Sequence, residues 1–552
     1  MKKKILTAVV AAALMANGAY ARDYVKNDLR SMFLNNEAVI FQINMRSFSA
    51  VDLDGNGIIE PEKGEKIGNF LSAIDRLDEF KELGVNAIHV MPITAVGKND
   101  ALGTAGSLYA MEKLDVIDPN ITDRTSNLTA KQQAKKFIDE AHKRGIRVFV
   151  DLPACVSPDM ALTKPELLLT DKTGKYIVPT TWTDVRLMKI VNANGSLYKP
   201  VLQEHKKFID MLFEIGADGV RADVAPLKPQ SFWSEIIHYA RSKDPQFMFL
   251  AESAEAWAPP KVPSPTINHK QLLDAGFDAY YGSCLDFLNF KSSKDFEKVF
   301  KHINELAKQG KTKALIGCFD THDLKSAYLG YSSNVIKKKK KFKDDSTYIG
   351  YDNLVKNRKQ AAYPKLKKRQ IPSKNYPQAI MYMNATLPVN PYFVDGFATG
   401  DRYDYAYANE DAKISYTDNL TYYVHPYQLD IFNYSRRPGG NDIKAAAMLK
   451  ETIALREKLG DIVTKGSLKF LKTSNNKVFA YERQYGNEGV IVVVNANQKS
   501  SVNAFVYVKC KEKLANCKVL TDSQDVIIKN GKLSVSLPEG KAAVIKYTVN
   551  KK

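Results

Sequence analysis

The sequence predicts an α/β fold, a closed (β/α)8 barrel followed by a separate antiparallel β-sandwich domain. Two observations indicate the barrel: short apolar runs alternate with amphipathic helical segments, and eight such runs lie between residues 38 and 397. Repeated strand–helix units form parallel sheets, and eight of them close into a barrel. A third observation indicates the second domain, because runs of alternating polar and apolar residues follow one another beyond residue 466.

The eight expected strands are short apolar runs. They occupy residues 38–48, 85–93, 146–153, 216–226, 247–257, 277–282, 313–323 and 390–397. The expected helices carry apolar residues at helical spacing and end at glycine. The clearest of them occupy residues 70–84, 128–145, 201–216 and 442–460. This pattern is that of a TIM barrel with a segment inserted after the third strand.

The first 21 residues are typical of a secretory signal peptide. Three lysines precede a short apolar stretch and a small-residue cleavage site, with cleavage expected before Arg22. The stretch is too short to span a bilayer, and no later run is long enough. We therefore expect a secreted or periplasmic protein without a transmembrane segment. The expected divisions are a signal peptide at 1–21, the barrel at 22–440 with its insertion at about 155–200, a helix and linker at 441–465, and the β-sandwich at 466–552.

The formal charge is +19, and part of it lies in the lysine-rich stretches 337–343 and 365–370. We interpret these stretches as solvated insertions, because no nucleic-acid-binding motif accompanies them. No nucleic-acid partner is expected, and we expect a monomer.

Five cysteines are present. Cys510 and Cys517 lie close enough in sequence for a small disulfide, which an exported protein could form. The other three, Cys155, Cys284 and Cys318, are scattered without metal-ligand spacing, and we interpret them as buried apolar residues.

The stretch GADGVRADVAP (216–226) carries two charged residues in an otherwise small and apolar run. Alternate residues of a barrel strand share a face, so Arg221 and Asp223 are expected to point inward. Asp223 lies near the carboxyl end of the strand, where barrel enzymes carry their chemistry. Arg221 would keep a buried carboxylate ionised, although a purely structural ion pair would give the same pattern.

Two neighbouring strands also end in carboxylates. Glu252 ends the fifth strand, and His322 and Asp323 end the seventh. Three carboxylates therefore converge on one mouth of the barrel. An ionised carboxylate about 5 Å from a protonated one supports retaining glycoside cleavage.

These motifs resemble those of glycoside hydrolase family 13, the α-amylase family, and the resemblance extends over nearly the whole chain after the signal peptide. DGVRAD resembles the strand-four motif, which implies that Asp223 is the nucleophile and Arg221 its partner. LAESAEAW resembles the strand-five motif and implies that Glu252 is the acid/base. FDTHD resembles the strand-seven motif, which implies that Asp323 stabilises the transition state and His322 binds the sugar.

Two aromatic residues are further candidates for sugar contacts. SLYAMEKLDVIDP (107–119) is similar to the family's loop after strand two, which implies that Tyr109 stacks on the sugar. Trp257 would form an aromatic wall for a sugar face. Packing roles explain both residues about as well.

The chain departs from the family pattern around the carboxylates. The strand-three motif keeps Asp151 but has Cys155 and Val156 where the family has an Asn that binds structural calcium and a His that contacts sugar. After the nucleophile, Pro226 and Leu227 replace the Lys-His common in α-amylases. The catalytic carboxylates are present, but the groups that hold the sugar differ.

The stretch DLDGNGIIE (52–60) predicts a calcium site, because oxygen ligands recur every second residue. The expected ligands are Asp52, Asp54, Asn56, the Ile58 carbonyl and Glu60. A similar loop follows strand one in several family members. An empty polar turn is the alternative.

We therefore expect a retaining α-glycosidase that hydrolyses α-1,4 bonds of starch, glycogen or maltooligosaccharides through a glycosyl–enzyme intermediate, with structural Ca²⁺. Transglycosylation, including maltosyl transfer, uses the same carboxylates and is a second hypothesis. A noncatalytic glucan-binding envelope protein is a third, motivated by the altered strand-three motif.

Overall fold

A computed structural model describes most of the two expected domains. The described residues are 28–51, 53, 61–101, 106–179, 184–253, 267–281, 292–298, 301, 316–318, 322, 376–398, 443–497, 500–509, 514, 516–529 and 532–549. Within these ranges, no helix is both long enough and apolar enough to cross a bilayer. The expected signal peptide and the lysine-rich stretches 337–343 and 365–370 lie outside the described residues.

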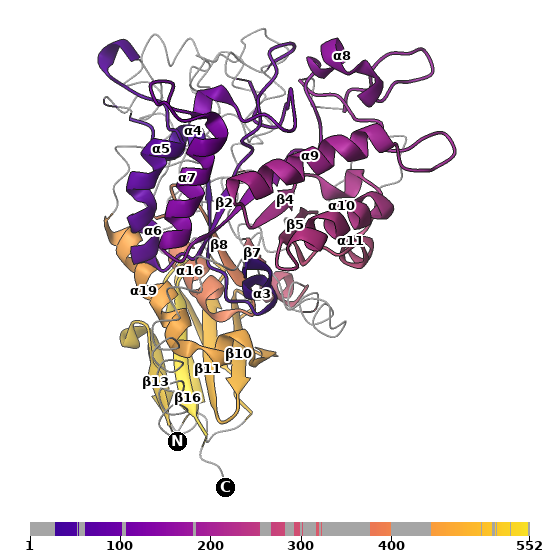
Figure 1. Cartoon of the computed structure of the whole chain (residues 1–552). Helices are drawn as coiled ribbons and strands as arrows, with labels where there is room; N and C mark the ends of the chain where they lie inside the picture. Colours follow the sequence, from indigo (N-terminus) through magenta and orange to yellow (C-terminus); the bar gives the residue numbers. More distant parts are fainter. Residues whose placement is uncertain are drawn as a thin grey trace, which may run out of the picture.

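Eight parallel strands form one sheet at the centre of the larger domain (Figure 1). They are β1 (Ile40–Ile43), β2 (Ala87–Val90), β3 (Arg147–Leu152), β4 (Gly219–Ala222), β5 (Met248–Glu252), β6 (Ala279–Tyr281), β7 (Ile316–Cys318) and β8 (Asn390–Val394). Neighbours pair in the order β6-β5-β4-β3-β2-β1-β8-β7, and β6 also contacts β7. The predicted eight-stranded barrel is therefore confirmed.

Helices surround the barrel strands. They include α5 (Phe70–Ala73), α6 (Leu77–Leu83), α7 (Ala130–Lys143), α9 (Lys199–Ile215), α10 (Gln230–Lys243), α11 (His269–Ala275), α16 (Tyr376–Thr386) and α19 (Ile443–Leu459). Short helices are α3 (Leu29–Leu34), α4 (Met45–Phe48), α8 (Met160–Thr163), α20 (Asp461–Thr464), and the 3-10 turns η1 (Pro61–Lys63), η2 (Ile74–Arg76), η3 (Pro119–Ile121), η4 (Pro165–Leu167), η5 (Ala225–Leu227) and η10 (Ser523–Asp525).

The predicted helix ends follow local chemistry. Thr129 begins α7 with a capping box that pairs its hydroxyl and backbone with Gln132. Gly84 and Gly216 end α6 and α9 with φ of 79° and 86°, a conformation that a Cβ atom disfavours. The helix expected over 70–84 is interrupted by the 3-10 turn η2, so it is two short helices instead of one.

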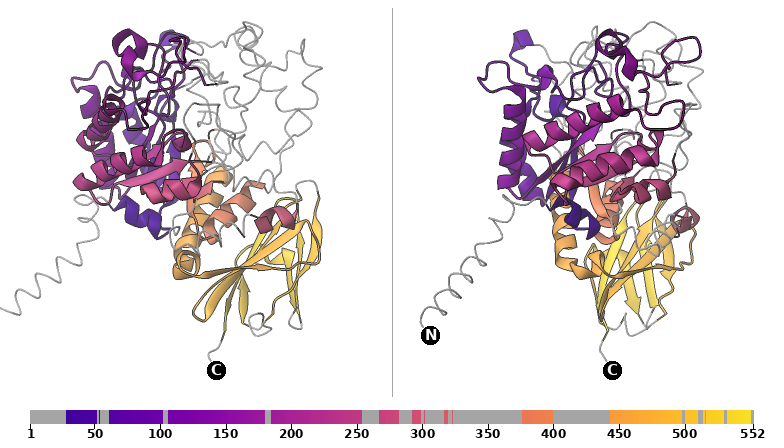
Figure 2. Two further views of the ribbon diagram at one scale, coloured as in Figure 1. Left: turned by 90° about the vertical axis from the view of Figure 1, so that its right-hand side faces the viewer. Right: turned by 45° about the vertical axis from the view of Figure 1, so that its right-hand side comes forward.

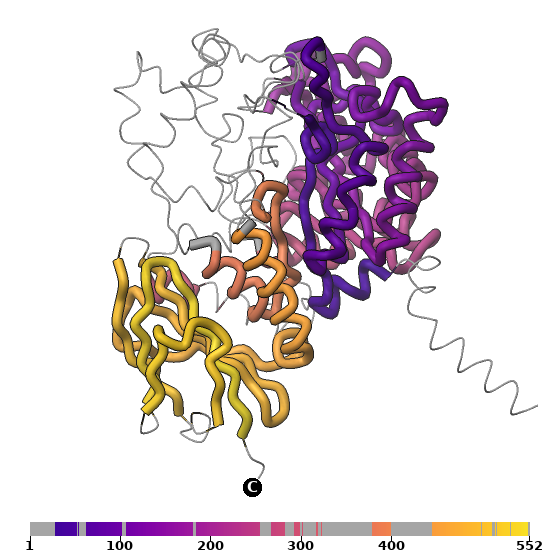
Figure 3. The backbone as a smooth tube through the Cα atoms, turned by 90° about the vertical axis from the view of Figure 1, so that its left-hand side faces the viewer, coloured from indigo at the N-terminus to yellow at the C-terminus, as the bar shows by residue number. Residues whose placement is uncertain are grey.

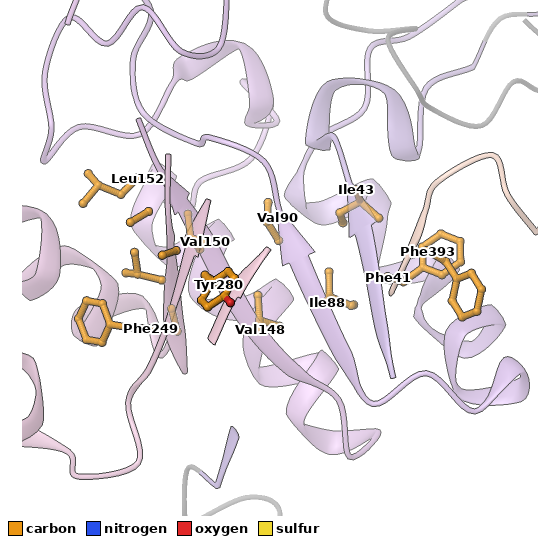
Figure 4. Packing of buried hydrophobic residues seen from close by; sticks show 14 of the residues in the cluster. Phe41, Ile43, Ile88, Val90, Val148, Val150, Leu152, Phe249, Tyr280 and Phe393 are labelled. Carbon is orange, nitrogen blue, oxygen red and sulfur yellow. The ribbon is translucent and has the colours of Figure 1, made fainter. Parts of the chain in front are cut away.

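Alternate residues of most barrel strands belong to two different cores. Ile88 and Val90 of β2 and Val148 and Val150 of β3 pack with the surrounding helices, as Figure 4 shows for this cluster. Ala87 of β2, by contrast, packs in the barrel interior with residues of β5, β6 and β8. Residues of α3 join the interior cluster. The period of two therefore decides which side chains enter the barrel.

The segment between β3 and α9 contains α8, η4 and several isolated bridges in place of a barrel helix. One of these bridges joins Val156 to Arg186, and another joins Leu168 to Met188. Val185 and Leu187 from this segment pack with Ala154 and Leu227 in a small apolar cluster. The segment thus meets the residues that follow β3 and β4.

Two antiparallel sheets form the C-terminal domain (Figure 2). The strands are β9 (Ser467–Leu471), β10 (Val478–Tyr485), β11 (Glu488–Asn495), β12 (Val502–Val506), β13 (Cys517–Val519), β14 (Val526–Lys529), β15 (Lys532–Leu537) and β16 (Ala542–Thr548). Their orders are β13-β16-β11-β10-β9 and β12-β15-β14. The predicted antiparallel domain is confirmed.

Helices α16 and α19 lie between the barrel and the C-terminal sheets (Figure 3). Arg456 of α19 is 5% exposed and donates only to backbone carbonyl oxygens. The acceptors belong to Asn36, Asn384, Ala385, Leu387 and Val389. Burial lowers the pKa of Arg456 to about 10. This arginine therefore joins segments far apart in the sequence.

The suggested Cys510–Cys517 disulfide is wrong, because Cys517 carries a free thiol. Its Sγ donates to the Leu514 carbonyl oxygen at 3.1 Å. Cys510 lies outside the described residues.

Candidate active site

Arg221 is the centre of the site at the carboxyl end of β4. Its Nη1 donates to Oδ1 of Asp223 at 2.9 Å, and the ion pair joins a fully buried guanidinium to a carboxylate whose side chain is 14% exposed. The Ala154 amide donates to the other carboxylate oxygen, Oδ2, at 2.9 Å. Both oxygens of Asp223 are thus held in place while part of the side chain stays accessible. The structure confirms that Arg221 and Asp223 lie together.

Asp151 at the end of β3 shares the same guanidinium. Arg221 Nη1 lies 2.8 Å and 3.0 Å from its two carboxylate oxygens, and the register pairs the two residues across β3 and β4. Burial opposes the charge of Asp151, but Arg221 and His89 outweigh it and lower its pKa. Burial also lowers the pKa of His89 to about 4, so its ring is neutral at neutral pH. Arg221 is therefore the positive charge that balances Asp151.

Glu252 ends β5 on the other side of Arg221. Arg221 Nη2 lies 3.1 Å from its Oε2, close enough for an ion pair but misaligned for a hydrogen bond. The Val224 amide donates to the same oxygen at 2.8 Å. Val224 has φ of 42°, a strained conformation for a β-branched residue. The turn after Asp223 thus aims a backbone donor at Glu252, whose side chain is 20% exposed.

The charges of Asp223 and Glu252 influence one another. Burial raises the pKa of Asp223 above its ordinary value, and the Arg221 charge opposes that rise. Asp151 adds to the rise, whereas the Ala154 amide and a hydrogen bond with Glu252 lower it. Two carboxyl groups this close share one proton most readily. The arrangement fits one ionised and one protonated carboxyl group.

A chain of hydrogen bonds places Tyr109 and His322 beside Asp151. Tyr109 donates its hydroxyl proton to Oδ2 of Asp151 at 2.9 Å. Its oxygen also lies 3.0 Å from Nε2 of His322, whose Nδ1 is 2.7 Å from Nε2 of Gln42. Because the Gln42 amide nitrogen only donates, Nδ1 of His322 accepts and Nε2 carries the proton. The Tyr109 and His322 rings are stacked, with centroids 5.8 Å apart.

Three interior residues of this network were missed from the sequence. Gln42 is on β1, His89 on β2 and Tyr281 on β6. Tyr281 accepts from Nε of Arg221 through its hydroxyl oxygen at 2.7 Å. The signal was available, because each is a polar residue at a barrel-facing position of an apolar strand. Such a position also suits a structural polar residue, so the pattern did not distinguish the two.

The residues that depart from the family pattern are buried. Cys155 is 4% exposed, and burial raises the pKa of its thiol to about 12, so it is neutral as expected for an apolar cysteine. Val156 bridges to Met111 and Arg186, and Leu227 packs in the same small cluster as Cys155. Cys155, Val156 and Leu227 therefore all take part in apolar packing.

Several predicted site residues lie outside the described residues. They are Asp323, Trp257 and the five calcium ligands Asp52, Asp54, Asn56, Ile58 and Glu60. Their predicted roles stay predictions. Within the described ranges, no group of three or more His, Cys, Asp or Glu side chains is arranged to hold a metal ion.

The fold and the site define an α/β barrel protein with a carboxylate pair, held by one arginine, at the carboxyl ends of β4 and β5. Residues 42–155 match the family model of the α-amylase catalytic domain, and residues 468–539 match that of the maltogenic amylase C-terminal domain. In these two regions the chain therefore resembles the α-amylase family.

Two relatives are about a quarter identical to this chain over the aligned regions alone. A Bacillus cyclomaltodextrinase is 27% identical over 203 residues, which cover 34% of this chain and 33% of the relative. An α-1,4-glucan:maltose-1-phosphate maltosyltransferase from Bifidobacterium animalis is 24% identical over 213 residues, covering 35% and 28%. The matched region spans about a third of the length of these relatives.

Solved structures share the fold across nearly the whole chain. A maltogenic α-amylase from Thermotoga neapolitana aligns with a TM-score of 0.60 at 18% identity, covering 94% of this chain and 100% of that one. An α-amylase from Lactobacillus plantarum aligns with a TM-score of 0.61 at 17% identity and the same coverage. At these sequence identities the similarity shows a shared fold alone.

Proposed function

We propose that this protein is a retaining α-glycosidase that hydrolyses α-1,4 bonds of α-glucans. The single observation that carries the proposal is the Arg221 guanidinium, which lies within ion-pair distance of both Asp223 and Glu252. Two neighbouring carboxyl groups, one ionised and one protonated, are the groups that double displacement requires.

In the first step, a carboxylate oxygen of Asp223 attacks the anomeric carbon of the sugar. The glycosidic bond breaks, and Glu252 gives its proton to the leaving oxygen. In the second step, Glu252 removes a proton from water, the water oxygen bonds to the anomeric carbon, and Asp223 leaves as a carboxylate. Arg221 holds Asp223 in the ionised form for attack. The predicted role of Asp323 is to stabilise the positive charge on the ring in both transition states.

Transfer to an acceptor sugar is a second candidate, favoured by the likeness to a maltosyltransferase over 213 residues. An acceptor hydroxyl would replace water in the second step without changing the carboxylates. The similarity of this chain to a cyclomaltodextrinase, over 203 residues, favours hydrolysis.

The test is incubation of the chain from Arg22 onward with soluble starch and with maltooligosaccharides, followed by chromatography of the products. Asp223→Asn is the inactive variant, and exposed Asp139→Asn is its matched control. Shortened products from the parent and the control alone are expected. Products longer than the substrate on adding maltose would indicate transfer, whereas a folded parent that binds starch without forming products would support the noncatalytic hypothesis.

A further inference from the structure

Lys228 is a buried cation on the far side of Ala154 from Asp223. It follows η5 directly and is 2% exposed. Its Nζ donates to the Ala154 carbonyl oxygen at 2.9 Å. It also lies 5.6 Å from the centroid of the Trp233 ring, which is itself fully buried. Burying an ammonium group is costly unless other groups compensate, so its retention needs a reason.

Ala154 connects Lys228 to the proposed nucleophile. The carbonyl oxygen of Ala154 accepts from Lys228, and the amide of the same residue donates to Oδ2 of Asp223. Ala154, which follows β3, is therefore bound by Lys228 through its carbonyl oxygen and binds the Asp223 carboxylate through its amide. A displacement of Ala154 would move a donor away from the attacking group.

The charge of Lys228 also acts on Asp223. Burial lowers the pKa of Lys228 to about 8, and Cys155 and Asp223 oppose that decrease. The Cys155 thiol is neutral near pH 7, because burial raises its pKa to about 12. His205 on α9 also faces this lysine, but burial and Lys228 lower the pKa of His205 to about 3 and keep it neutral. Among the described groups that act on Lys228, Asp223 is thus the one that carries a negative charge.

We propose that Lys228 is a positioning residue for the nucleophile, holding the Ala154 amide on Asp223 and supplying a second buried positive charge behind its carboxylate. The inference rests on the proposed function, since it assigns Asp223 the attacking role. Arg221 supplies the first charge from the barrel interior, and Lys228 supplies the other from the β3 and β4 loops. The lysine does not touch the substrate in this role.

Two variants separate the hydrogen bond from the charge. Lys228→Gln keeps a donor for the Ala154 carbonyl but removes the charge, whereas Lys228→Met removes both. The substrate is α-maltosyl fluoride, because fluoride needs little acid assistance to leave and its release therefore reports attack by Asp223. The measurements are kcat and KM from pH 5 to 10 and the urea unfolding midpoint of each protein, with exposed Lys243→Met as control.

We expect kcat of Lys228→Met to fall about 10- to 100-fold with KM nearly unchanged, as a misplaced catalytic group predicts. Lys228→Gln should retain most of the kcat at the pH optimum. In both variants the acid limb of the plot of kcat against pH should move up by about one pH unit. Asp223 loses a neighbouring positive charge, which raises its pKa.

A purely structural lysine would change the unfolding midpoint and leave kcat and the pH profile of the folded variants as in the parent. That result for Lys228→Gln would overturn the inference even if Lys228→Met failed to fold. A parent that releases no fluoride would instead contradict the proposed function, so the two failures are distinguishable.

Discussion

Arg221 and Asp151 form an ion pair in which both side chains are fully buried, with Nη1 2.8 Å from Oδ1. The same nitrogen also donates to Asp223, so the pair is part of the apparatus that orients the proposed nucleophile. Burying a charge is costly, and a buried ion pair is stable only where each charge is compensated by its partner. Asp151 therefore helps to orient, through Arg221, the residue that is proposed to attack.

Removing the charge of Asp151 is expected to reduce both activity and stability. In Asp151→Asn, Arg221 loses its fully buried counter-charge, and breaking such a pair costs about 3–5 kcal/mol. We expect a loss of kcat of at least tenfold and a clear decrease in the urea unfolding midpoint. Asp139→Asn, at an exposed ion pair, should change neither. Parent-like kcat in Asp151→Asn would show that Arg221 is positioned without it.

Replacing Arg221 by lysine should also impair the site although the charge is kept. Lysine cannot donate at once to Asp151, Asp223 and the Tyr281 hydroxyl from a planar group. We expect kcat/KM for α-maltosyl fluoride to fall about 10²- to 10³-fold, the scale of losing one preorganised donor. Arg124→Lys, on an exposed side chain, is the control. Equal rates for the two variants would argue that charge alone is needed.

Acid should destabilise the fold through two buried histidines. Burial lowers the pKa of His89 to about 4 and of His205 to about 3, from the ordinary 6.5. The unfolded chain therefore binds more protons than the folded one between pH 6.5 and these values, and stability falls as pH decreases through that window. The urea midpoint should decrease from pH 7 to pH 5. Between pH 7 and pH 5 the urea midpoint of His205→Leu should decrease less than that of the exposed control His238→Asn. Parallel curves of midpoint against pH for the two variants would contradict this assignment.

Removing the Arg456 guanidinium should destabilise the protein without changing the chemistry. Arg456→Met leaves five buried carbonyl oxygens without this donor, and each unsatisfied group costs about 1–3 kcal/mol. We expect a large decrease in unfolding midpoint but parent-like KM in the folded fraction. Lys458 is exposed and lies two residues further along α19, so Lys458→Met should have little effect. A changed KM would indicate that this interface also shapes the site.

Calcium should stabilise the protein if the loop 52–60 binds it as proposed. Chelation with EDTA is expected to lower the thermal midpoint of the parent, and added Ca²⁺ should restore it, because a ligand of the native state stabilises by mass action. Asp54→Asn should weaken this response, whereas Asp139→Asn should keep it. A midpoint that does not respond to Ca²⁺ in the parent would favour the empty polar turn.

The sequence was sufficient to place the barrel strands and the carboxylates Asp223 and Glu252 at the ends of two of them. Each expected strand contains an observed one, although β4 comprises only Gly219–Ala222 of the expected 216–226. The boundaries were too wide because apolar residues continue into buried turns, where Val224 adopts a left-handed conformation. Likewise, the break at η2 within residues 70–84 leaves no trace in the apolar spacing, since a 3-10 turn nearly preserves it.

The sequence by itself determined the closed barrel, the antiparallel second domain and the inward direction of Arg221 and Asp223. Those properties depend on periodicity along the chain, which every strand and helix carries locally. Only the tertiary structure decided that Arg221 is shared with Asp151, that Tyr109 donates to the same carboxylate, and that Lys228 lies behind Ala154. These partners lie 42 to 74 residues apart, and backbone register and loop path, which no local pattern encodes, bring them within hydrogen-bond distance.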